Sequence, residues 1–156
     1  MYHYKESGLD NVFLGNGYRV HETRYGEGVS ISESAALHRA IGKWLILLPK
    51  PLNGAELRFL RVEMDTTQKH LAAITGATEQ TLRLWEKHRR KAIPGPADRL
   101  VRILYSEFTG GDGSVWRRLE RLAAVEPLEH ADGCFQQAEN RRWKYCASPV
   151  RSAGER

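Results

Sequence analysis

The sequence predicts a mainly α-helical protein with a small N-terminal antiparallel β-sheet, an α+β fold. Three observations indicate this class. Beyond residue 34, several segments repeat apolar residues every three or four positions, as the buried face of a helix does. Two short segments between residues 66 and 86 are bounded by threonine and glycine, which favour the beginnings and ends of helices. The first thirty residues are instead rich in glycine, aromatic and β-branched residues, which is typical of strands and turns.

The chain has 156 residues, enough for one domain or for two small domains that share a core. Its residues are 41% hydrophobic and 28% charged, a composition typical of globular rather than disordered proteins. The net charge of +5 is compatible with a nucleic-acid partner. Two cysteines, Cys134 and Cys146, make no disulfide framework, so we expect free thiols in a reducing cytoplasm. No apolar run suggests a signal peptide or a membrane span, which also favours a cytoplasmic location.

The N-terminal part, residues 1–50, is expected to be a small module of strands and one helix. Segments 12–14 and 18–23, separated by a glycine-rich turn, predict a β-hairpin, and 25–31 is a candidate third strand. Segment 34–48 predicts a helix with a single apolar stripe, which prolines then end. That stripe is either part of the core or a surface for a partner.

A second domain is expected over residues 53–125, followed by a flexible tail over 126–156 that shows no periodicity. In this tail, segment 141–145 mixes arginine and lysine with aromatic residues. Such a segment is either a solvated terminus or a tail that contacts nucleic acid. The helices expected in the second domain cover 54–64, 68–75, 78–86, 96–108 and 114–125.

The most informative segment, residues 68–86, predicts two short helices joined by a tight turn. Gly76 follows the first helix, where a left-handed backbone is often needed, and Thr78 is placed to cap the second. Leu82 and Trp85 lie on one face of the second helix and can hold it against the first. This layout suits insertion into a DNA major groove. The alternative is an ordinary pair of core helices with a solvated basic face.

The polar residues left on the outer side carry the predicted recognition chemistry. Glutamine can pair with adenine, arginine with guanine, and glutamate can accept from cytosine. Gln68 suits a phosphate contact, and the basic run after Trp85 would meet the DNA backbone. Leu84 either contacts a thymine methyl group or points into the bundle. The predicted DNA-binding residues are Gln68, Lys69, Thr78, Glu79, Gln80, Arg83, Lys87, Arg89, Arg90 and Lys91.

The spacing of Gln68, Leu71–Ala72, Gly76 and Trp85–Glu86 resembles the Cro/repressor-like (XRE) helix-turn-helix family. The resemblance covers residues 53–108 and implies a bundle of about five helices that binds double-stranded DNA. It implies a transcriptional regulator, a repressor that binds an inverted repeat. One recognition helix reads only a few base pairs, so we expect a homodimer.

Segments 4–12, 37–41 and 54–61 resemble, more narrowly, the MqsA (YgiT-type) antitoxin and regulator family. In that family a small zinc-binding module precedes the XRE-type domain, and many members neutralise a toxin. The zinc site needs four thiolates, and no cysteine precedes Cys134, so we expect no metal and no other cofactor. The resemblance keeps open an alternative function, an antitoxin that binds a small toxin protein and represses its own operon.

The sequence predicts no enzymatic activity. Its six histidines are scattered, and none has the His-Glu-x-x-His spacing of a zinc hydrolase. No glycine-rich loop leads into the lysine of a phosphate-binding loop. No nucleophile, base and orienting group can be placed together.

Overall fold

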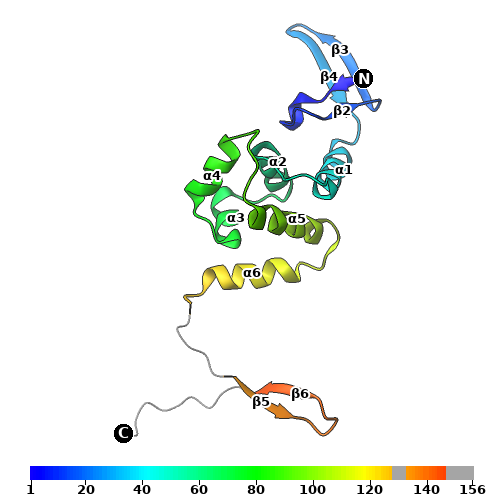
Figure 1. Ribbon diagram of the computed structural model, residues 1–156. Coiled ribbons are helices and arrows are strands. Elements are labelled where there is room, and N and C mark those ends of the chain that lie inside the picture. Colours follow the sequence, from blue (N-terminus) through cyan, green and yellow to red (C-terminus); the bar gives the residue numbers. More distant parts are fainter. Residues whose placement is uncertain (128–132, 147–156) are drawn as a thin grey trace. The chain divides into compact units, whose positions relative to one another are not determined.

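The computed structural model describes residues 1–127 and 133–146 (Figure 1). Residues Met1–Ala124 form one compact unit, and Val125–Arg156 form a second. The described residues make six α-helices and three two-stranded antiparallel sheets, which confirms the α+β class. None of the helices in this described part is long and apolar enough to cross a membrane.

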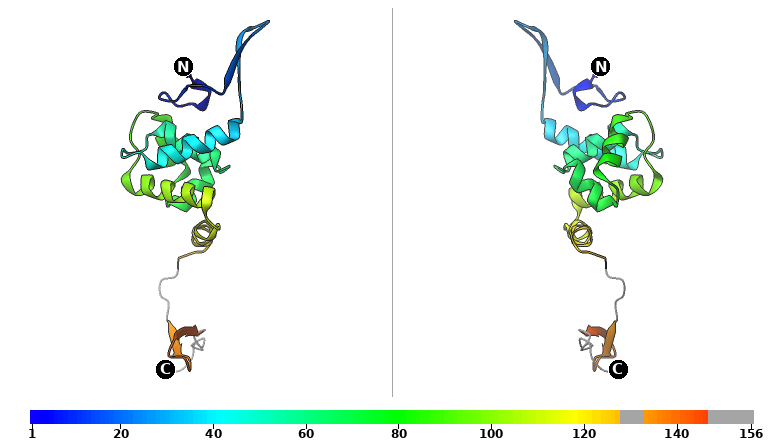
Figure 2. Two further views of the ribbon diagram at one scale, coloured as in Figure 1. Left: turned by 90° about the vertical axis from the view of Figure 1, so that its right-hand side faces the viewer. Right: turned by 90° about the vertical axis from the view of Figure 1, so that its left-hand side faces the viewer.

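The prediction that segments 12–14 and 18–23 pair as a hairpin is wrong. β2 (Phe13–Leu14) pairs with β1 (Tyr2–His3), whereas β3 (Tyr18–Thr23) pairs with β4 (Gly26–Ile31). The turn of the longer hairpin therefore lies at residues 24–25, and the glycine-rich turn connects two separate sheets. The β3–β4 ladder joins six residue pairs, many more backbone groups than the two residues of β2 can satisfy. Figure 2 shows this hairpin extending away from the helices.

Six helices build the rest of the first unit. α1 packs against α2 and α5, α2 also packs against α4, and α6 lies against α3 and α5. The core holds leucines from most of these helices, so the first fifty residues share one core with the helices that follow. The helices are α1 (Ser34–Leu47), α2 (Gly54–Glu63), α3 (Gln68–Thr75), α4 (Glu79–Lys87), α5 (Gly95–Gly110) and α6 (Ser114–Ala124).

The apolar stripe of α1 is divided between core and surface. Ile41 and Leu45 are buried, and Leu45 is fully inaccessible to solvent. Trp44 and Leu47 are exposed, at 42% and 79% of their surfaces. The core interpretation therefore holds for the side of α1 that faces α2 and α5.

Two polar clusters tie the N-terminal segments to the bundle. His38 on α1 donates from Nδ1 to the Glu63 carboxylate (2.9 Å), and its Nε2 shares a second hydrogen bond with the Tyr4 hydroxyl (2.7 Å). Arg102 on α5 donates to the carbonyl oxygens of Ile46 (2.8 Å) and Leu48 (3.0 Å). A cation at a helix C-terminus is favourable because the last carbonyl groups carry partial negative charge. Arg102 therefore fixes the end of α1 on α5.

The second unit contains a hairpin where we expected a flexible tail. β5 (Cys134–Gln137) pairs with β6 (Trp143–Cys146), and the free-thiol expectation is also wrong because the two cysteines form a disulfide. They face each other in the ladder with Cα atoms 5.3 Å apart, which suits a disulfide. Each strand has four residues, too few for a clear periodic signal. Residues 128–132 and 147–156 of the expected tail lie outside the described residues.

Candidate nucleic-acid interface

α3 and α4 form two helices joined by a three-residue turn, with the predicted caps. The Thr67 hydroxyl accepts from the His70 amide at the start of α3 (3.1 Å). Gly76 ends α3 with a φ of 71°, a backbone conformation that glycine adopts at little cost. The Thr78 hydroxyl accepts from the Thr81 amide at the start of α4 (3.1 Å). The local sequence thus determines where both helices begin and end.

The inner side of α4 is held by a buried leucine and a buried carboxylate. Leu82 is fully inaccessible, and Glu86 is only 7% exposed. Glu86 accepts from the Arg61 guanidinium of α2 (Nη2 to Oε2, 3.1 Å) and from the side-chain amide of Gln68 (2.7 Å). Gln68, predicted to contact phosphate, therefore directs its amide donor inward. Sequence spacing did not reveal this contact, because it joins residues eighteen positions apart across two helices.

The start of α2 lies directly against the end of α4. A β-carbon on Gly54 would collide with the backbone carbonyl of Trp85, so only glycine permits this approach. The Gly54 amide also donates to the carbonyl of Lys91 in the loop after α4 (3.2 Å). Together with Glu86, this contact fixes the C-terminal half of α4 against α2.

The outer side of α4 is polar and exposed. Glu79, Gln80 and Arg83 project from its first turns into solvent. Arg83 donates to Glu79 one turn away (2.7 Å), and both side chains remain largely exposed. An exposed pair of this kind contributes little to stability, so either partner can exchange it for another contact. The three side chains have the chemistry to read base edges.

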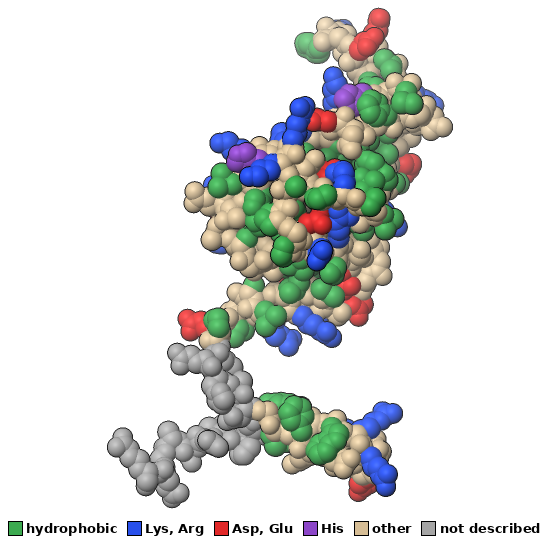
Figure 3. Space-filling model, in the orientation of Figure 1, with side chains coloured by type: hydrophobic (Ala, Val, Ile, Leu, Met, Phe, Trp, Pro, Cys, Tyr) green, Lys and Arg blue, Asp and Glu red, His purple; other side chains and the backbone are tan. Residues whose placement is uncertain are grey.

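Several of the predicted basic residues are open to solvent. Lys69 on α3, Lys87 at the end of α4 and Lys91 in the following loop are exposed. In the orientation of Figure 3, Lys, Arg and His side chains gather near the end of α4. Such a cluster suits the phosphates of a duplex.

The N-terminal segment reaches two of the predicted phosphate-binding residues. Arg89 donates from Nη2 to the carbonyl of Gly8 (2.6 Å). Arg90 lies 3.6 Å from the carboxylate of Asp10, yet its side chain is 90% exposed. No local sequence pattern indicates this proximity, since about eighty residues separate the partners. Arg89 is thus partly engaged within the protein, whereas Arg90 remains accessible.

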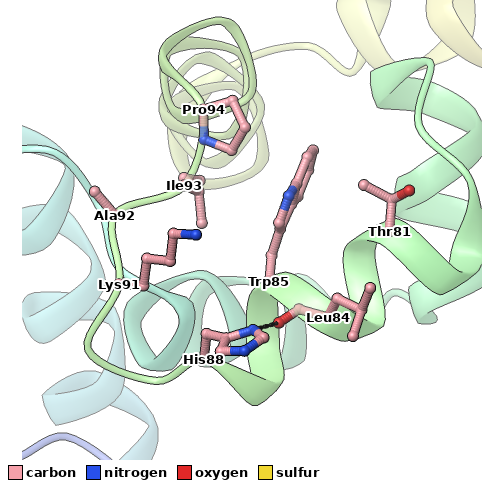
Figure 4. Close-up of a pocket in the computed structure, with 8 residues that line it drawn as sticks. All are labelled: Thr81, Leu84, Trp85, His88, Lys91, Ala92, Ile93 and Pro94. Atoms are coloured by element: carbon pink, nitrogen blue, oxygen red, sulfur yellow. Dashed lines mark hydrogen bonds between the residues drawn. The ribbon is translucent and has the colours of Figure 1, made fainter.

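A mainly apolar cavity of about 370 Å³ opens beside α4 (Figure 4). Figure 4 shows the Trp85 ring standing within it, with Thr81 on one side and Ile93 and Pro94 on the other. Leu84 is 46% exposed, so it points away from the bundle, as contact with a thymine methyl group would require. The cavity is lined by Thr81, Leu84, Trp85, His88, Lys91, Ala92, Ile93 and Pro94.

Among the described residues, no three His, Cys, Asp or Glu side chains gather as metal ligands would. No protein-family model, curated protein or solved structure matches this chain.

Proposed function

We propose that the protein is a sequence-specific DNA-binding transcriptional regulator, a repressor that binds an inverted repeat as a homodimer. One observation carries the proposal: α4 is packed on its inner side through Leu82 and Glu86, while its first turns present Glu79, Gln80 and Arg83 to solvent. A rigid helix with free polar side chains at its leading end suits the major groove. The resemblance of residues 53–108 to XRE-type regulators supports the same function, and the regulator would act at the nucleoid in the cytoplasm.

Each group of residues has a role in this proposal. Glu79, Gln80 and Arg83 read base edges, and Thr78 lies beside them at the start of α4. The exposed basic residues bind phosphates on either side of the groove, as positioning contacts commonly do. The basic group consists of Lys69, Lys87, Arg89, Arg90 and Lys91.

Gel-shift titration of the purified full chain with DNA from upstream of its own gene tests the proposal. We expect one site to be bound at least about a thousandfold more tightly than shuffled DNA of the same composition. Footprinting should protect two half-sites separated by about one helical turn, because each protomer presents one α4. Equal binding to both DNAs, or no binding at low salt, would contradict the proposal.

A second candidate function is that of an antitoxin, which a different observation favours. Most side chains of the β3–β4 hairpin are exposed, and Tyr25 at its turn is fully exposed. Tyr18 and Ile31 at its base pack against the core, but Val20, on the same face, is 54% exposed. The outer part of a two-stranded ribbon is marginal in water, so a protein partner would stabilise it. Co-purification with the product of an adjacent small reading frame, and its loss in a Tyr25→Ala variant, would support this function. If no such complex forms on co-expression, the antitoxin function is contradicted and only the regulator function remains.

A further inference from the structure

The hairpin of the second unit has two chemically different faces. Successive residues of a strand alternate between faces, and directly paired residues share one. Phe135 pairs with Tyr145, and Gln137 pairs with Trp143, so all three aromatic residues lie on one face. The disulfide lies on the other face, with the Gln136–Lys144 pair.

The aromatic face is open to solvent. Phe135, Trp143 and Tyr145 are 62%, 67% and 66% exposed. The rings of Phe135 and Tyr145 meet edge to face, with centroids 5.8 Å apart, which leaves ring surface free on both. Aromatic side chains usually bury most of their area, so three together at this exposure indicate a binding surface.

The charges of the hairpin identify the kind of partner. Over residues 133–146, three basic side chains, Arg141, Arg142 and Lys144, accompany a single acidic one, Glu139. The two arginines lie in the turn, at one end of the aromatic face. An apolar protein surface would satisfy the rings and leave these cations without partners. A chain of phosphates that carries flat, unpaired bases satisfies both.

We propose that this hairpin binds single-stranded nucleic acid, with bases stacked on Trp143, Tyr145 and Phe135 and phosphates paired with Arg141 and Arg142 in the turn. Trp143 and Tyr145 are two residues apart on one strand, about 6.8 Å, so each ring can receive a separate base. This activity does not depend on α4 and is additional to duplex recognition.

The disulfide makes this binding sensitive to reduction. A two-stranded hairpin of four-residue strands is marginal by itself, and here the covalent bond closes the end opposite the turn. One dithiothreitol molecule transfers two electrons and two protons to the cystine, yielding two thiols and the cyclic disulfide of the reagent. The reduced hairpin no longer holds its rings on one face, so binding falls.

Fluorescence anisotropy of labelled dT12 and rU12 with the full-length chain tests the proposal. We expect Trp143→Ala/Tyr145→Ala to weaken binding by about tenfold or more, since each stacked base contributes substantially. Gln136→Ala, on the opposite face, is the matched control and should stay within about twofold of wild type. The two probes distinguish a DNA strand from an RNA strand.

Closure of the hairpin can be checked in every variant. The chain has only two cysteines, so the absence of reactive thiols reports an intact disulfide. The double variant Cys134→Ser/Cys146→Ser should weaken single-strand binding and leave duplex binding unchanged, and treatment with dithiothreitol should do the same. Trp143→Phe keeps an aromatic ring and should retain single-strand binding. The proposal would be overturned if the Trp143→Ala/Tyr145→Ala variant, with its disulfide intact, bound dT12 and rU12 as tightly as wild type. It would also be overturned if the oxidised wild type bound neither probe. Unchanged binding after reduction would overturn the redox dependence.

Discussion

At the scale of single residues, Glu86 connects the proposed recognition helix to the rest of the bundle. Its carboxylate accepts from Arg61 on α2 and from Gln68 on α3. Both members of the ion pair are largely withdrawn from water, with side-chain exposures of 14% for Arg61 and 5% for Glu86. A buried charge is tolerated when it is paired and is costly once its partner is removed.

Glu86→Ala should therefore destabilise the first unit by about 3–5 kcal/mol, because Arg61 is left as an unpaired buried cation. Urea unfolding followed by circular dichroism measures this loss. The double variant Arg61→Met/Glu86→Leu removes both charges and should recover most of the stability. If the double variant is as unstable as the single one, Glu86 stabilises the fold through its shape and packing rather than through its charge.

Arg83→Ala should cost about 1–3 kcal/mol of binding free energy on the specific DNA site and relax sequence preference there. The side chain is exposed and held only by Glu79, so its removal should leave the fold intact. Competition gel shifts with specific and shuffled duplexes measure both effects. Arg118→Ala removes the same charge from the exposed surface of α6 and serves as the control. An equal loss on both duplexes would argue against base reading.

Arg90→Ala should weaken binding to every duplex by a similar factor, because a phosphate contact carries no sequence information. The dependence of log affinity on log salt should become shallower by about one. Titrations at several salt concentrations give this slope directly. A slope equal to that of wild type would remove Arg90 from the contact surface.

The sequence identified the outward residues of α4 by polarity and helical spacing, and the structure places Glu79, Gln80 and Arg83 on the exposed side. It did not identify what Gln68 contacts. Glutamine is compatible with both a phosphate and a buried carboxylate, and the choice depends on where Glu86 lies. Contacts of this kind depend on how helices cross, which spacing within one helix does not specify.

At the scale of elements, the close crossing of α1 and α5 depends on a glycine. A β-carbon on Gly42 would overlap the ring of Tyr105, which is almost fully buried. Helices were predictable because each repeats its apolar side chains, and α2, α3 and α4 also begin with side-chain caps. The strand pairing was not predictable from the sequence, because β2, β3 and β4 all satisfy the same short-range pattern. Which strands pair depends on the hydrogen bonds of the whole ladder.

Gly42→Ala should destabilise the first unit by about 1–3 kcal/mol, since the added methyl group forces α1 and α5 apart or displaces the tyrosine. Thermal or urea unfolding measures the effect. Gly95→Ala is the matched control, because nothing lies within 4 Å of its β-carbon position. A Gly42→Ala variant as stable as the control would show that the crossing tolerates a wider separation.

At the scale of the whole molecule, buried tyrosines link distant parts of the first unit. Tyr4 joins the N-terminal segment to α1, and Tyr105 fills the space between α1 and α5. Burial raises the pKa of both phenols above the ordinary value of 10.0. The folded state therefore holds these protons more tightly than the unfolded chain does.

The contribution of these two phenols to stability should consequently be constant up to about pH 10 and fall above it, since the unfolded chain releases phenolic protons first. Urea unfolding at a series of alkaline pH values measures this decline. Tyr4→Phe removes one of the two buried phenols and should make the decline shallower. An identical slope in wild type and Tyr4→Phe would contradict the assignment.

α4 is held in place by contacts at its inner side and C-terminal end, whereas the side chains of its first turns are exposed. Gly54, Leu82 and Glu86 determine where the helix sits, whereas positions 79, 80 and 83 contribute almost nothing to folding. Under the proposed function, duplicated genes would acquire new operators by changing three exposed codons and leave the scaffold untouched. A randomised library at these positions should yield mostly folded proteins with different preferred DNA targets.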